Sequence, residues 1–127
     1  MTIEQMLDSA IAHHRAGRLA HAEQLYRAIL AQQPDHADAL HLLGVLASQT
    51  GHHADACEWI GKALAVRPAA EFYFSLAGAM VPLRQFDQAV DALRRAISLK
   101  PDHVDAMNNL AAALHAQNRF DEAEKVI

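Results

Sequence analysis

The sequence has few aromatic residues, a single cysteine and no long apolar run, and each shortage excludes a class of protein. Aromatic residues make up 6% of the chain, which argues against a β-sandwich core of aromatic and β-branched side chains. Cys57 is the only cysteine, so no internal disulfide can form and a reducing compartment is expected. No apolar run approaches the roughly 20 residues of a membrane-spanning helix, and the N-terminus lacks a secretory layout. We therefore expect a soluble, cytoplasmic chain with no membrane partner.

The sequence also lacks an excess of positive charge and the short motifs of enzyme active sites. The formal net charge is -4, so no broad positive field attracts phosphates, and nucleic acid is not an expected partner. G-x-S-x-G, H-E-x-x-H, C-x-x-C and glycine-rich phosphate loops are absent, which predicts a non-catalytic chain without a cofactor. None of the nine histidines pairs with another at i, i+4, so no metal site is expected.

Small and apolar residues instead recur at a regular spacing. Four alanines lie 34, 33 and 34 residues apart: Ala22, Ala56, Ala89 and Ala123. A large side chain stands four positions after each alanine, on the same face of a helix: Tyr26, Ile60, Leu93 and Ile127. Three prolines follow the same period: Pro34, Pro68 and Pro101. The alanines predict closely packed helix pairs, and the prolines predict where the second helix of each pair ends.

A further apolar run precedes each of these alanines, and residues 37–68, ADALHLLGVLASQTGHHADACEWIGKALAVRP, form the most regular unit. The pattern resembles the W-x2-L-G-x2-Y, A-x3-F and P pattern of the tetratricopeptide repeat family. This resemblance covers essentially the whole chain and implies an all-α fold, a right-handed superhelical solenoid of antiparallel helix pairs. It predicts a single domain, 1–127, with repeats 3–36, 37–69, 70–103 and 104–127, the last of them truncated.

The third repeat departs from the others at both ends of its first helix. Asp35 and Asp102 precede the first helices of the second and fourth repeats and are expected to cap them. Ala69 stands at the corresponding place in the third repeat, so that helix is expected to lack a side-chain cap. Pro82 falls where the same helix should still be running, which predicts an end or a kink near Val81.

The family resemblance also implies a concave groove that is lined by the first helix of each pair and binds peptides or partner helices. The matching positions are Leu7, Ile11, His14, Arg15, His41, Val45, Ser48, Gln49, Phe74, Gly78, Val81, Asn108, Asn109, Ala112 and His115. Arg15 is the only fixed positive charge among them, so the family's carboxylate clamp for chaperone tails is not expected. The apolar members predict an apolar peptide anchored near Phe74. The alternative is that these side chains pack between helices.

These observations predict a non-catalytic scaffold for protein or peptide partners. The alternative is the N-terminal recognition arm of a larger enzyme, such as a bacterial glycosyltransferase or sulfotransferase, whose repeats residues 34–47 resemble. The fourth repeat stops within its second helix, without a closing proline, so we expect either a further domain or self-association. The strip expected to mediate self-association consists of Phe120, Ala123 and Ile127.

Overall fold

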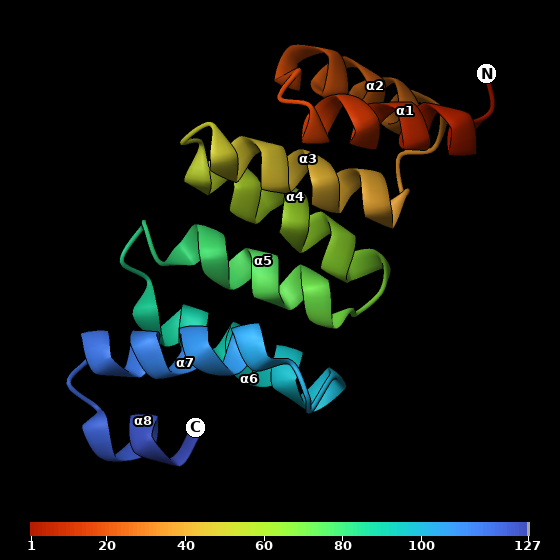
Figure 1. The fold of residues 1–127 in the computed structure, drawn as a ribbon. Helices are drawn as coiled ribbons and strands as arrows, with labels where there is room; N and C mark the ends of the chain where they lie inside the picture. Colours follow the sequence, from red (N-terminus) through yellow and green to blue (C-terminus); the bar gives the residue numbers. More distant parts are fainter. Residues whose placement is uncertain (127) are drawn as a thin grey trace. The chain divides into compact units, whose positions relative to one another are not determined.

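The structure, a computed structural model, describes residues 1–126, which form eight α-helices and no strand. The helices are α1 (Ile3–Arg15), α2 (Leu19–Gln32), α3 (Ala37–Gln49), α4 (His53–Val66), α5 (Ala70–Met80), α6 (Phe86–Leu99), α7 (Val104–Ala116) and α8 (Phe120–Val126). Short turns join α1 to α2, α3 to α4, α5 to α6 and α7 to α8, so the helices of each pair run antiparallel (Figure 1). The all-α fold predicted from the sequence is confirmed.

The helices gather into two compact units, each with a core of its own. The N-terminal unit, Met1–Arg67, contains α1 to α4, and the C-terminal unit, from Pro68 onward, contains α5 to α8. Buried side chains in the core of the N-terminal unit include Met6, Ala10, Ala22, Tyr26, Ile29, Leu43 and Leu46. Those of the C-terminal unit include Ala77, Ala89, Val90, Leu93, Ala96, Leu110, Leu114 and Ala123. The predicted single domain of four repeats stays a prediction.

Small residues are buried in the second helix of each pair, and a glycine is buried where α3 packs on α4. The four periodic alanines are each at most 1% exposed, and Gly44 is buried opposite Ile60. A Cβ atom added to Gly44 would lie 2.5 Å from Cγ1 of Ile60 and 3.2 Å from the carbonyl oxygen of Ala56. Helices α3 and α4 therefore pack too closely to admit a side chain at Gly44.

The large side chains that follow the periodic alanines fill the two cores, as their spacing predicted. Tyr26, Ile60 and Leu93 are at most 1% exposed. The fourth of them, Ile127, lies outside the described residues. Burial of this i, i+4 pair in three successive second helices confirms the packing stripe that was read from the sequence.

Histidines, not aspartates, cap the first helices of the second and fourth repeats. Nδ1 of His36 accepts a hydrogen bond from the amide of Ala39 (3.1 Å), and Nδ1 of His103 accepts one from the amide of Ala106 (3.1 Å). The prediction that Asp35 and Asp102 cap these helices is therefore wrong. Each helix starts one residue later than expected, which places the histidine at the N-cap, where a side-chain acceptor reaches the third amide of the helix.

The irregular first helix of the third repeat behaves as its sequence predicted. Ala69 is the N-cap of α5 and provides no side-chain hydrogen bond. The helix ends at Met80 with Val81 as its C-cap, directly before Pro82. The missing cap and the early end are both confirmed.

The turn inside each helix pair contains one residue in the left-handed backbone region. These residues recur at the repeat spacing, with φ angles of 82°, 84°, 59° and 58°: Gly17, Gly51, Arg84 and Asn118. Glycine adopts this conformation freely, and asparagine tolerates it. A side chain such as that of Arg84 makes it about 1–2 kcal/mol less favourable, so the third turn is strained where the first two are not.

Candidate functional site

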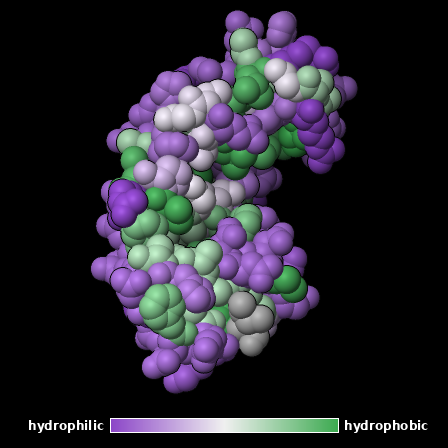
Figure 2. Space-filling view, turned by 60° about the vertical axis from the view of Figure 1, so that its left-hand side comes forward, coloured by the Kyte–Doolittle hydropathy of each residue, from purple (hydrophilic) through white to green (hydrophobic). Residues whose placement is uncertain are grey.

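A groove opens in the C-terminal unit between α5, the start of α6 and the second half of α7. It is lined by Ala77, Gly78, Val81, Pro82, Phe86, Leu93, Asn109, Ala112, Ala113 and Ala116, and its volume is about 310 Å³. Asn109 is the only polar side chain among these lining residues. Figure 2 shows that apolar side chains reach the surface between hydrophilic ones. The groove thus offers an apolar floor with a single amide.

The groove exists because its walls carry small side chains. Gly78 on α5 and Ala112 and Ala116 on α7 are exposed, and a Cβ atom added to Gly78 would meet no other atom within 4 Å. Val81 is 40% exposed at the end of α5, where Pro82 stops the helix. The early end of α5 and the small residues of α7 together leave room for an apolar side chain from outside.

The structure brings four of the sequence-predicted groove positions together in this place. Gly78, Val81, Asn109 and Ala112 all line the groove. Asn108 and His115 are also exposed on α7 but do not line it.

Phe74 takes a more interior position than the peptide anchor expected from the sequence. It is half-buried, packs against the core of the C-terminal unit, and its ring centroid lies 4.9 Å from that of His103. His103 is buried, and its Nε2 lies 3.0 Å from Oε1 of Glu71 without forming a directed hydrogen bond. A Phe74→Ala replacement would therefore disturb folding as well as any ligand contact.

Three helices of the N-terminal unit meet at His14, another predicted groove residue. Nδ1 of His14 lies 2.8 Å from the hydroxyl oxygen of Tyr26, and Nε2 lies 2.6 Å from Oε1 of Gln49. The amide oxygen of Gln49 accepts a hydrogen bond, so Nε2 carries the hydrogen and Nδ1 of the neutral ring accepts from Tyr26. His14 and Gln49 thus join α1, α2 and α3 to one another. Burial raises the pKa of Tyr26 to about 12, which keeps its phenol protonated at neutral pH.

The remaining predicted positions of the N-terminal unit differ in their exposure. Leu7, Ile11, His41 and Val45 are half-buried, and Leu7 packs against the core. Arg15 is exposed at the end of α1. These positions border no cavity described for this unit.

Trp59 borders two surface cavities that are lined by α2, α3 and α4 of the N-terminal unit. Its ring packs beside the core and lies under two cations, Arg27 at 5.5 Å and Lys62 at 4.9 Å from the ring centroid. Glu23 accepts a hydrogen bond from Arg27 at 3.0 Å. These contacts describe a surface tryptophan covered by long side chains, whose stems pack on the ring.

The described part of the chain holds neither a metal-binding cluster nor a membrane-spanning helix. Within residues 1–126, no three histidine, cysteine, aspartate or glutamate side chains gather closely enough to hold a metal ion. Over the same residues, no helix is long and apolar enough to cross a lipid bilayer.

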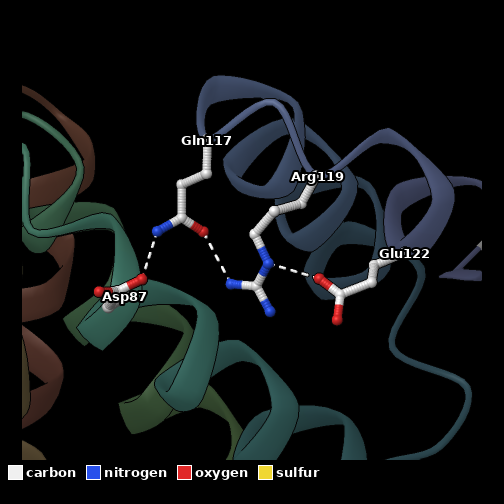
Figure 3. Close-up of polar contacts among 4 residues, drawn as sticks. All are labelled: Asp87, Gln117, Arg119 and Glu122. Carbon is white, nitrogen blue, oxygen red and sulfur yellow. Dashed lines mark hydrogen bonds and ion pairs between the residues drawn. The ribbon is translucent and has the colours of Figure 1, made fainter.

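Polar contacts tie the last turn of the C-terminal unit to α6 and α8. Figure 3 shows Gln117 between Asp87 and Arg119, with Arg119 reaching on to Glu122. Nη1 of Arg119 donates to Oε1 of Gln117 at 2.9 Å. The hydrogen bond from Arg119 lowers the pKa of the Glu122 carboxyl below its ordinary value of 4.5.

Glu122→Gln should therefore remove a pH-dependent part of the stability. Because the pKa of Glu122 is lower in the folded protein than in the unfolded chain, its contribution is present above pH 4.5 and is lost as the pH falls through the folded-state pKa. Thermal unfolding of the wild type and Glu122→Gln across the acidic range should show a slightly higher melting temperature for the wild type. This difference should disappear on acidification. An advantage that stays constant on acidification would contradict the role given to this carboxylate.

The predicted self-association strip is not one continuous exposed surface among the residues described. Phe120 is 50% exposed, and its ring centroid lies 5.2 Å from that of His115. Ala123 is buried in the core of the C-terminal unit, and Ile127 lies outside the described residues.

Comparisons with known proteins place these helix pairs in a family. A family model described as tetratricopeptide repeat matches residues 13–78 and 83–127. The chain is 35% identical over 112 residues to Protein O-mannosyl-transferase TMTC1 of Mus musculus, a match that covers 84% of this chain and 12% of the relative. The chain thus spans about an eighth of the length of that relative.

Solved structures share the fold. A structure of the Thermobaculum terrenum O-GlcNAc transferase superposes with a TM-score of 0.85 at 31% identity, covering 89% of this chain and 22% of the transferase. A crystal structure of MamA superposes with a TM-score of 0.86 at 26% identity, covering 92% of this chain and 69% of MamA. These likenesses agree with a helical solenoid. Because the family model matches nearly the whole length, the chain belongs to the tetratricopeptide repeat family.

Proposed function

We propose that the chain is a protein-interaction module that holds an apolar peptide segment in the groove of the C-terminal unit and performs no catalysis itself. The observation that carries this proposal is the groove between α5 and α7, with exposed small residues on both walls and one amide on its lining. An apolar cavity with few polar groups is the usual form of a ligand site. The family membership supports a peptide or partner helix as the ligand.

The groove positions proposed to bind this segment are a subset of those predicted from the sequence. Gly78, Val81, Asn109 and Ala112 make the contact in our proposal, whereas Phe74 packs against the core of the unit. The positions on α1 and α3 are not needed for the binding proposed here.

Gly78→Leu should block the groove without unfolding the protein. The new side chain enters open space on α5, and leucine favours a helix over glycine by about 0.5–1 kcal/mol. Peptides that bind the wild type would first be selected from a random library displayed on phage. Their affinities for the wild type and for the variant would then be measured by fluorescence anisotropy. We expect Gly78→Leu to weaken binding by about tenfold or more, since the loss of one buried apolar side chain is about 1.5 kcal/mol or more.

Gly61→Leu is the matched control for this experiment. Gly61 also lies in a helix, is also exposed and has equally open space at its Cβ position, but it borders no described cavity. Circular dichroism should show both variants folded. Equal affinity of the two variants for the selected peptides would contradict the proposal, as would a library that yields no binding peptide.

A second candidate function has support in the comparisons: the chain is the N-terminal recognition arm of a larger enzyme, such as a glycosyltransferase. Its support is the similarity to two transferases, of which the chain covers only 12% and 22%. The coding sequence downstream of the codon for Ile127 tests this candidate. A transferase domain there supports it, and a stop codon directly after Ile127 contradicts it.

A further inference from the structure

The third turn carries an arginine in a backbone conformation that suits glycine. Arg84 has a φ of 59°, and the equivalent turns of the first two repeats have Gly17 and Gly51 at φ angles of 82° and 84°. Glycine at position 84 would remove the strain. Backbone strain of this kind is concentrated at functional sites, so we expect the side chain of Arg84 to have a role that glycine cannot provide.

The guanidinium of Arg84 lies beside a residue that lines the groove. Its central carbon is 5.4 Å from the ring centroid of Phe86, and Phe86 itself lines the groove together with Val81 and Pro82 from the same turn. Arg84 is exposed and forms no salt bridge with any residue that the structure describes. The acid three residues later, Asp87, accepts a hydrogen bond from Gln117 instead. A positive charge without an acidic partner therefore stands next to Phe86 of the groove lining.

We propose that Arg84 recognises a carboxylate of the bound segment, so that the groove selects peptides in which an aspartate or glutamate stands close to a bulky apolar residue. The proposal rests on the groove function given above. The apolar side chain fills the cavity, and the carboxylate meets the guanidinium that Phe86 supports. A guanidinium stacked on a ring keeps its N–H edge free for two parallel hydrogen bonds to a carboxylate. Charge complementarity thus commits the groove to an acidic, apolar segment of a partner protein.

The test compares peptide selections from one random phage-displayed library against four proteins. These are the wild type, Arg84→Gln, Arg84→Gly and the control Arg95→Gln. Arg95 is a matched control, because it is exposed in the same unit and lies over an aromatic ring, Tyr73, at 5.8 Å. Tyr73, unlike the Phe86 ring beside Arg84, does not line the groove. Wild type and Arg95→Gln should enrich peptides that combine a bulky apolar residue with a nearby acid. Both Arg84 variants should still enrich peptides with a bulky apolar residue but should show no preference for a nearby acid.

A selected peptide then gives the size of the effect. Changing its acid to the corresponding amide should weaken binding to the wild type by about tenfold, as expected for loss of a charge-assisted hydrogen bond, and should leave binding to Arg84→Gln unchanged. Arg84→Gly should also melt at a higher temperature than the wild type, because it relieves the left-handed backbone strain. This combination of higher stability with lost acid preference is not expected from a residue that merely supports the fold.

The outcomes separate the two proposals. Unchanged acid preference in both Arg84 variants would overturn the role of Arg84 and leave the groove function standing. A library that enriches apolar residues without acids in the wild type would do the same. A library that enriches nothing in the wild type would contradict the groove function, and the role of Arg84 would fall with it.

Discussion

Ile60→Ala is expected to lower the free energy of unfolding by about 2–5 kcal/mol, the usual range for a fully buried isoleucine cut to alanine. Ile60 is 0% exposed in the core face of α4, and its Cγ1 fills the space that Gly44 leaves on α3. Removing it opens a cavity at the closest approach of the two helices. Urea denaturation followed by circular dichroism measures the change, and a loss below 1 kcal/mol would contradict tight packing at this point.

Gly44→Ala provides the companion measurement, since it adds an atom where Ile60→Ala removes several. On its own, overpacking against Ile60 and the carbonyl of Ala56 should destabilise the protein by up to about 3 kcal/mol. The higher helix propensity of alanine should offset about 1 kcal/mol of this loss. In the Ile60→Ala background the same change should cost much less, because the side chain 2.5 Å from the new Cβ is gone. Additive effects of the two changes would contradict the close approach of α3 and α4.

His14→Ala is expected to destabilise the protein by about 1–3 kcal/mol, the cost of leaving a buried polar group without a partner. The hydroxyl of the buried Tyr26 loses its hydrogen bond to Nδ1, and Gln49 loses the contact that joins α3 to α1. Thermal or urea unfolding of the variant measures the loss.

A Tyr26→Phe background separates this effect from lost packing. With the hydroxyl absent, His14→Ala should lower the free energy of unfolding clearly less than it does in the wild type. An equal loss of stability in both backgrounds would assign the loss to packing of the imidazole instead.

Ionisation of Tyr26 gives a second check: its folded-state pKa of about 12 lies above the ordinary value of 10.0. The stability linked to it should be intact below pH 10.0 and decline as the pH rises toward 12.

The fold followed from the spacing of small and apolar residues, because that spacing decides which helix faces can pack. Ala22, Ala56 and Ala89 recur at the repeat period, and all three are buried. The helix caps could not be read in the same way. Aspartate and histidine stand side by side after two of the prolines, and a shift of one residue in the helix start decides which of them becomes the cap.

The groove could be predicted only in part. Gly78, Val81, Asn109 and Ala112 followed from the family's first helices. Phe86 begins a second helix and came into the lining because α5 ends early. Arg84 gave no signal by residue type, since an exposed arginine in a turn is ordinary. Aligning the turns of the four repeats would have revealed it, because two of the other three have glycine there.

The most direct test of the central claim is a titration of ¹⁵N-labelled protein with a library-selected peptide, followed by amide chemical shifts. The groove function predicts the largest changes at Gly78, Val81, Asn109 and Ala112, with the indole N–H of Trp59 unaffected. Shift changes centred on Trp59, or shift changes spread over the chain without a maximum at Gly78 and Ala112, would contradict the groove function.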